Sequence, residues 1–164
     1  YRMRIVSTNP VRTSVDNLID IKINTPPTLT ASNNGNSAGI TIAVENTSAS
    51  TQSDVTVRVY FTPDGRPAGD YQYTINGFNF SVGAPNYVGG STLAPTSSGG
   101  SDYFLVTIPL DLDPGETVTF SGQFRAGYSM PFDITNDWWY TTTTGMTDYI
   151  PVYIGGTLNT GLEP

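Results

Sequence analysis

The stretch ITIAVENTSASTQSDVTVRVYFT, residues 40–62, contains two runs in which apolar and polar residues alternate. The first run covers residues 40–44 and the second covers residues 55–61. Alternation with a period of two puts every second side chain on one face, as in a strand that buries one side. The polar residues between the runs are typical of a loop. The stretch therefore predicts two β-strands.

The same alternation recurs on either side of this stretch, at residues 2–6, 19–23, 103–108, 117–124 and 149–154. Turn-forming tripeptides lie between the runs: Asn-Asn-Gly at 33–35, Pro-Asp-Gly at 63–65 and Asp-Pro-Gly at 113–115. No segment of useful length has a helical period. Several short strands separated by turns predict an all-β sandwich or barrel.

Two segments, residues 25–38 and 83–101, are expected to be surface loops because glycine, serine and proline are frequent in them. Too few residues precede the first segment to build a hydrophobic core of their own. We therefore expect residues 1–164 to form a single domain, an ordinary size for a chain of 164 residues.

The chain has neither cysteine nor histidine. Disulfides, thiolate metal sites and nucleophile systems that need a histidine base are therefore excluded. The formal net charge is −7, with six arginines and a single lysine, Lys22. No basic face for nucleic acid or for an anionic membrane can be assembled from so few cations. No apolar run approaches the length of a membrane span.

Polar uncharged residues dominate the composition: threonine accounts for 24 of 164 residues, and only 13% are charged. This composition is typical of an extracellular β domain, secreted or at a bacterial cell surface. Glycoside hydrolysis requires two carboxylates about 5–10 Å apart across a cleft. The three glutamates, Glu45, Glu116 and Glu163, lie at a strand end, in a turn and at the C-terminus. None forms a convincing catalytic pair, so we predict that the chain is not an enzyme.

Five stretches resemble family 3 carbohydrate-binding modules, the cellulose-binding type of cellulases, scaffoldins and biomass-sensing surface proteins. They are residues 40–62, TPDG at 62–65, LDPGETVTFSGQF at 112–124, FDITNDWWY at 132–140 and DYIPVYIGGTLNTGLEP at 148–164. Residues 1–10 also resemble the family's first strand, and residues 11–39 then look like an insertion. The resemblance implies a jelly-roll β-sandwich of two antiparallel sheets with about nine strands.

The family usually holds one structural calcium ion. The positions that match its ligands are Thr62, Asp64, Asp133, Asn136 and Asp137. Calcium takes six to eight oxygen ligands, and carboxylates, an amide and a threonine supply such oxygens. The alternative is that these residues are ordinary turn formers, since Pro-Asp-Gly and Asn-Asp favour turns by themselves. The ion would fix loops and would not take part in catalysis.

Flat cellulose is bound in the family by a coplanar strip made of an aspartate–arginine pair, a histidine, a tyrosine and a tryptophan. This sequence departs from that pattern, because the arginine position matches Gln123, the tryptophan position matches Ser129, and the aspartate and histidine fall near Thr74 and Ile75. Tight binding to crystalline cellulose is therefore not expected. The substitute sugar-binding residues are Tyr71, Tyr73, Phe78, Tyr87 and Tyr128, with Gln123. For each tyrosine the alternative is a partly buried strand residue.

The family also has a shallow groove on the opposite sheet, and its residues are better kept: Arg58, Tyr60 and Tyr103, with Trp139 or Tyr140 adjoining. An arginine among tyrosines can bind a single sugar chain or a linker peptide. It can equally lie across the rings to shield them.

Two functions follow from this pattern. The first is a non-catalytic module, monomeric within a larger protein, that holds its parent on cellulose or a related plant polysaccharide. The second is a structural module on the same scaffold that docks a linker peptide or a neighbouring domain through the groove.

Overall fold

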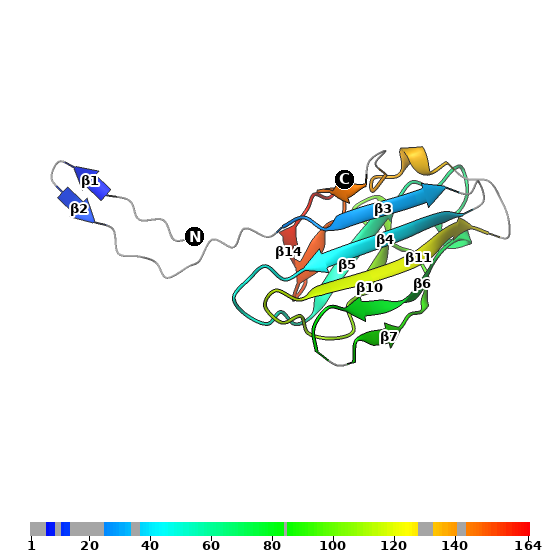
Figure 1. Cartoon of the computed structure of the whole chain (residues 1–164). Coiled ribbons are helices and arrows are strands. Elements are labelled where there is room, and N and C mark those ends of the chain that lie inside the picture. Colours follow the sequence, from blue (N-terminus) through cyan, green and yellow to red (C-terminus); the bar gives the residue numbers. More distant parts are fainter. Residues whose placement is uncertain are drawn as a thin grey trace.

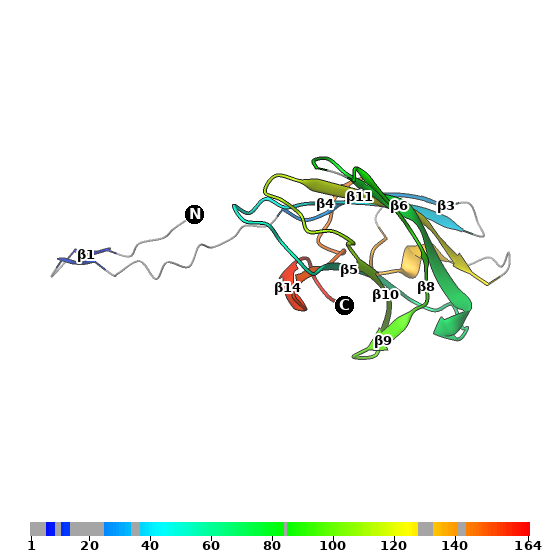
Figure 2. The ribbon, with the colours of Figure 1, turned by 90° about the horizontal axis from the view of Figure 1, so that it is seen from below.

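The computed structural model describes residues 6–8, 11–13, 25–33, 37–83, 85–127, 133–140 and 144–164. Most of them form two antiparallel sheets that pack face to face (Figure 1, Figure 2). This arrangement matches the predicted jelly-roll sandwich. Figure 2 shows the two layers edge-on, with the C-terminus beside the layer that contains β5.

The larger sheet has seven strands in the order β12-β3-β4-β11-β6-β7, with β8 also paired to β6. Two of its long central strands, β4 and β11, bury every second side chain, as the alternation in the sequence predicts. The third, β6, lies outside the predicted runs and keeps this pattern up to a bulge at Asn76. The strand bounds are β3 (Thr28–Asn33), β4 (Ala38–Glu45), β6 (Tyr71–Phe80), β7 (Tyr87–Gly89), β8 (Thr92–Leu93), β11 (Thr117–Ala126) and β12 (Gly145–Met146).

The smaller sheet has five strands in the order β14-β13-β5-β10-β9. Two single-turn 3-10 helices, η1 (Ala68–Asp70) and η2 (Ile134–Asn136), lie in the connections. The strand bounds are β5 (Val55–Phe61), β9 (Thr96–Ser98), β10 (Ser101–Thr107), β13 (Val152–Ile154) and β14 (Thr157–Thr160).

The core between the sheets is rich in aromatic rings. Phe104 of β10 stacks on Phe61 of β5, with ring centroids 4.9 Å apart, and meets Phe124 of β11 edge-on at 5.5 Å. Trp139, which is fully buried, contacts Phe124 from the loop after η2. Large buried rings contribute several kcal/mol each to folding, so these contacts join the two sheets into one hydrophobic core.

Two of the expected loops contain strands. Residues 25–38 include β3, which pairs with β4 because Leu29 and Ala31 alternate with threonines and point into the core. Residues 83–101 include β7, β8 and β9, which are short and mostly exposed. Their glycine, serine and threonine content hides the strand signal, because edge strands need little apolar surface.

The N-terminal strands β1 (Val6–Thr8) and β2 (Val11–Thr13) pair with each other in a separate ribbon, drawn away from the sandwich in Figure 1. Among the described residues, segment 1–10 therefore contributes no strand to the sandwich, in contrast to its resemblance to the family's first strand. The strand expected at 19–23 lies outside the described residues. The assignment of residues 1–164 to one domain stays a prediction.

Candidate functional site

The outer face of the seven-stranded sheet carries mainly hydroxyl and amide side chains, with Arg125 of β11 as an exposed cation among them. Register fixes their neighbours: Ser121 lies opposite Thr41 on β4, and Gln123 lies opposite Thr74 on β6. Thr74 and Thr92 share a hydrogen bond of 3.0 Å between their hydroxyls. These groups offer donors and acceptors for sugar hydroxyls without any ion pair.

Tyr87 is the aromatic residue of this face among the described residues. Its side chain is 55% exposed, and its ring lies across Gly77, where an added Cβ would come within 2.5 Å of three ring and hydroxyl atoms. The Tyr87 hydroxyl donates a 2.9 Å hydrogen bond to the carbonyl of Asn76. The glycine thus makes room for an aromatic ring held on the sheet, a surface on which a sugar ring can stack.

Gln123 also lies on this face and is exposed, as predicted for a sugar-contacting residue. Its Oε1 accepts a 2.8 Å hydrogen bond from Nη2 of Arg125, two residues along the same strand. Gln123 occupies the position of the family's arginine, and Thr74 beside it matches the aspartate. Gln123 and Thr74, with the guanidinium of Arg125 bonded to Gln123, therefore stand where the resemblance places an aspartate–arginine pair.

Three other residues proposed for the sugar platform are wrong for that role. Tyr71, Tyr73 and Phe78 point into the core, with at most 6% of their surface exposed. Tyr71 and Tyr73 share the period-two face of Ile75, and a bulge at Asn76 turns Phe78 inward as well. Burying the apolar ring of a tyrosine stabilises the fold more than leaving its hydroxyl in water does. A tyrosine in a strand therefore does not by itself indicate a binding surface. Tyr128 and Ser129 lie outside the described residues.

The five proposed calcium-binding residues come together at one end of the sandwich. Thr62 follows β5, and its hydroxyl donates to the carbonyl of Asn136 at 3.1 Å. Asp64 accepts hydrogen bonds from the backbone N–H of Asp133 at 2.9 Å and from the amide of Asn136 at 2.7 Å. The loop at 62–64 and the turn η2 are therefore joined through hard oxygen and amide groups, the ligand types that calcium selects.

Asp137 is the buried member of this group, with 6% of its surface exposed. Its Oδ1 accepts a 2.9 Å hydrogen bond from the N–H of Thr62. Its Oδ2 is buried and makes no hydrogen bond of normal geometry among the described residues, although the side chain of Trp139 lies close enough to interact with this carboxylate. Burial, and next the charges of Asp64 and Asp133, raise the pKa of Asp137 to about 8. An unpaired, buried carboxylate oxygen is an atom that a cation would satisfy.

The candidate calcium site nevertheless differs from the predicted ligand set, in which Asp64, Asp133 and Asp137 all supply carboxylates. Asp133 uses its carboxylate to cap η2, accepting from the N–H of Thr135 at 2.8 Å and from its hydroxyl at 2.6 Å. These two bonds lower the pKa of Asp133. In the described parts of the chain, no three acidic side chains gather into a metal-binding group. A calcium ion at this place would therefore use Asp64 and Asp137 with neutral oxygens of Thr62 and Asn136.

The predicted groove lies on the outer face of the five-stranded sheet, where Arg58, Tyr60 and Tyr103 meet. The guanidinium of Arg58 sits 4.8 Å from the ring centroid of Tyr103, and the rings of Tyr60 and Tyr103 are 5.0 Å apart. Both tyrosines are buried although they point away from the core. Arg58 therefore lies across the rings, as the second of the two interpretations expects, and ligand binding by Arg58 stays a prediction.

Three further residues, missed in the sequence, complete this groove. Tyr153 lies under the guanidinium of Arg58 at 4.1 Å, Glu163 forms an ion pair with it at 2.6 Å, and Trp138 lines the neighbouring hollow. Trp139 belongs to the core, so its proposed place beside the groove is wrong and Trp138 takes it. The typical ending Gly-x-Glu-Pro was the available signal for Glu163, but a carboxylate 105 residues from Arg58 gives no pairing pattern.

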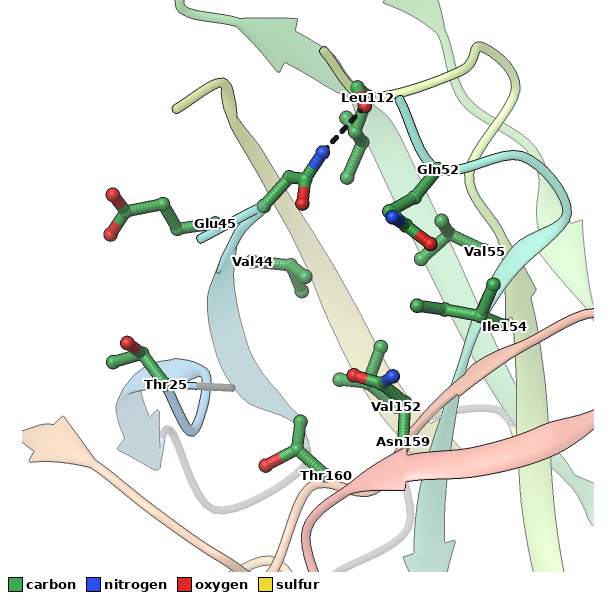
Figure 3. Close-up of a pocket in the computed structure, with 11 residues that line it drawn as sticks. Thr25, Val44, Glu45, Gln52, Val55, Leu112, Val152, Ile154, Asn159 and Thr160 are labelled. Carbon is green, nitrogen blue, oxygen red and sulfur yellow. Dashed lines mark hydrogen bonds between the residues drawn. The ribbon is translucent and has the colours of Figure 1, made fainter. Parts of the chain in front are cut away.

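A separate hollow opens between the two sheets, at the end of the sandwich opposite the candidate calcium site (Figure 3). Five of its eleven lining residues are aliphatic, and Val44, Val55 and Ile154 point inward. Asn46 donates a hydrogen bond of 2.8 Å to the carbonyl of Leu112, and Glu45 points away from the centre. The lining residues therefore provide no catalytic group.

Comparisons with known proteins agree with this architecture. A sequence model of the family described as "Cellulose binding domain" matches residues 27–161. No curated protein matches the chain. The family match begins just before β3, so it covers the whole sandwich and excludes the β1–β2 ribbon.

Several solved structures share the fold. The family 3a module with flanking linkers from scaffoldin CipA of Clostridium thermocellum has a TM-score of 0.68 and 24% identity over 86% of this chain and 91% of its own. A family IIIa domain from Clostridium cellulolyticum has a TM-score of 0.69 and 22% sequence identity, and the match covers 85% of this chain and 97% of that domain. Biomass-sensing modules of putative RsgI-like proteins from Clostridium thermocellum have a TM-score of 0.62 and 20% sequence identity, and the match covers 86% of this chain and 99% of the module.

No helix in the described part of the chain is long and apolar enough to span a bilayer.

Proposed function

Since this chain belongs to the family of cellulose binding domains, matched over residues 27–161, we propose that it holds a parent protein on plant polysaccharide through the outer face of the seven-stranded sheet. The family consists of non-catalytic carbohydrate-binding modules, so the prediction that the chain is not an enzyme is confirmed. The observation that carries the proposal is the ring of Tyr87, fixed across Gly77 on the same polar face as Gln123 and Thr74.

The chemistry of this face favours single or loosely ordered chains over crystalline cellulose. A flat crystal is held by several coplanar rings at once, whereas Tyr87 supplies one ring among the described residues of this face. The remaining contacts are hydrogen bonds, which exchange with water and contribute modestly. We therefore propose that the module prefers amorphous cellulose or soluble β-glycans.

The proposed setting is extracellular, with the module attached to an enzyme, a scaffoldin or a biomass sensor. Holding a parent protein on its substrate raises the local concentration of that parent without new chemistry. The net charge of −7 suits an uncharged ligand, because a strongly acidic domain repels a polyanion.

We further propose that a calcium ion is held by Asp64 and Asp137 with oxygens of Thr62 and Asn136. The unpaired Oδ2 of Asp137 and its raised pKa support this proposal. The ion would offset the buried negative charge and join the loop at 62–64 to η2.

The alternative function, docking of a linker peptide or a neighbouring domain through the groove, has one observation in its favour. The chain's own C-terminal segment already reaches the groove, with Glu163 bonded to Arg58. The same observation means that a second peptide would have to displace this segment.

Retention on insoluble and soluble polysaccharides tests the proposed face. Tyr87→Ala should weaken binding to amorphous cellulose roughly two- to tenfold, because an aromatic contact contributes about 0.5–1.5 kcal/mol. Tyr149→Ala is the matched control, since Tyr149 is also an exposed tyrosine, at 43%, but belongs to another part of the surface. Equal loss in both variants, or no retention of the wild type on cellulose, xylan or xyloglucan, would show that the proposal is wrong.

A further inference from the structure

The carboxylate of Glu163 receives three side-chain donors on one oxygen. Arg58 donates from Nη1 to Oε1 at 2.6 Å, Tyr60 donates from its hydroxyl at 2.9 Å, and the hydroxyl of Tyr153 bonds to the same oxygen. Hydrogen bonds from Tyr153, and next from Tyr60, lower the pKa of Glu163. The group is therefore arranged for an ionised carboxylate.

The donors also have contacts that do not involve Glu163. The rings of Tyr60, Tyr103 and Tyr153 are buried, each with at most 6% of its surface exposed. Arg58 lies against two of these rings and also donates to the hydroxyl of Tyr60 at 3.0 Å. The Nε of Arg58 is buried without a hydrogen-bond partner among the described residues. Donors fixed in advance around an acceptor are the usual form of a binding site.

Glu163, by contrast, is partly exposed and follows β14 near the end of the chain. Its side chain is 44% exposed, and the preceding residue is fixed by two hydrogen bonds: Leu162 donates to the carbonyl of Asp148 at 2.6 Å and accepts from the indole of Trp138 at 3.1 Å. An open hollow lies beside the Glu163 carboxylate. Its lining is polar and hydroxyl-rich: Arg58, Tyr60, Ser98, Gly99, Ser101 and Pro164.

We infer that Arg58, Tyr60 and Tyr153 form a carboxylate-binding site that Glu163 fills from within the chain, and that the external ligand is a uronic acid residue carried on an otherwise neutral polysaccharide. The inference rests on the proposed function only in taking polysaccharide as the partner, because the site lies on the opposite sheet. Hydroxyls in the hollow suit a sugar ring, and the tyrosines beside Arg58 make its charge weakly hydrated.

Charge decides which acidic polysaccharide fits. The chain carries a net charge of −7, and Arg58 is the cation of this groove among the described residues that line it. A continuous polyuronate would bring repulsion along its whole length. A neutral backbone with isolated uronate substituents brings one carboxylate to one guanidinium, and its neutral sugars can lie along the adjoining hollow beside Trp138.

Glu163 then acts as a competitor that is tied to the site. A short tether gives such a group an effective concentration in the millimolar range. Removing the carboxylate should therefore expose the site and tighten the binding of an external uronate by at least about tenfold.

The test is a calorimetric titration with a xylo-oligosaccharide that carries one glucuronate, and with the same oligosaccharide without it. The proteins are the wild type, Glu163→Ala, Glu163→Gln and the double variant with Arg58→Gln. The glucuronate-bearing oligosaccharide should bind Glu163→Ala at least about tenfold more tightly than the wild type. That gain should disappear in the double variant, and the unsubstituted oligosaccharide should show no change.

Thermal unfolding confirms that each variant is folded, and Glu163→Gln, which keeps an acceptor for the tyrosine hydroxyls, replaces Glu163→Ala if the latter fails to fold. Equal affinities for the two oligosaccharides in the folded variants would overturn the inference. Binding of an acetyl-Gly-Leu-Glu-Pro peptide, without binding of the glucuronate-bearing oligosaccharide, would also overturn the inference and would indicate a peptide ligand. Retention on neutral amorphous cellulose tests the proposed function separately, because Glu163→Ala leaves the seven-stranded sheet intact.

Discussion

Replacing Asp137 by asparagine tests the electrostatics of the candidate metal site. The substitution keeps an oxygen to accept the N–H of Thr62 and puts a neutral NH₂ group where the unpaired Oδ2 is buried. The shape of the side chain stays nearly the same, so the change in the free energy of unfolding reports mainly the loss of charge.

The size of the effect follows from the pKa of Asp137. Its folded-state value of about 8 lies roughly four units above the ordinary 3.8, and each unit corresponds to about 1.36 kcal/mol. The folded protein binds the proton more tightly than the unfolded chain does. Without metal, the free energy of unfolding should therefore be highest at low pH and fall as pH rises from about 4 to about 8, by at most about 6 kcal/mol.

Urea denaturation in excess chelator, at about pH 5 and about pH 8, measures this dependence. The wild type should lose stability between the two, whereas Asp137→Asn should lose much less and be the more stable protein at the higher pH. The unpaired amide hydrogens of asparagine cost about 1–3 kcal/mol, which reduces the difference. Calcium should reverse the order, because it stabilises the wild type by mass action. Equal pH dependence in both proteins, or equal stabilisation by calcium, would refute the reasoning.

Three further predictions concern the packing around the sites. Gly77→Ala should displace the ring of Tyr87 and weaken polysaccharide retention as much as Tyr87→Ala does, which retention assays of both variants compare. Phe104→Ala should lower the free energy of unfolding by about 3–5 kcal/mol in denaturant titrations, because the ring lies at the centre of the aromatic core. Asn46→Ala should cost about 1–3 kcal/mol in the same assay, since the buried amide donates to the carbonyls of Leu112 and Ser50.

The alternation of apolar residues predicts several of the long strands but not β6, whose ten residues lie outside the predicted runs. β4, β5, β10 and β11 begin and end within a few residues of the predicted runs, because each buries a full row of side chains. β7, β8 and β9 could not be predicted in this way. They pair at the edges of the sheets through backbone hydrogen bonds, which leave no hydrophobic pattern in the sequence.

The candidate sites depended on information that a linear sequence lacks. The direction of Tyr71 and Tyr73 follows from their phase with Ile75, which the sequence does contain, but tyrosine fits either face of a strand. Tyr87 could be predicted as exposed only by knowing that Gly77 lies next to it, and β7 gives no register before it is paired. Short-range patterns thus predicted strands better than they predicted surfaces.

The two sheets present opposite kinds of chemistry to their surroundings. The outer face of the seven-stranded sheet offers hydroxyls, amides and one ring, with Arg125 as an exposed donor beside Gln123. The outer face of the five-stranded sheet holds Arg58 in a nest of tyrosines and neutralises it with Glu163 from the chain's own C-terminal segment. In a chain with a net charge of −7, an arginine left without a carboxylate would be a strong attractor for any acidic group nearby. Glu163 keeps that attraction within the molecule, and a ligand with a single carboxylate has the chemistry needed to compete with it.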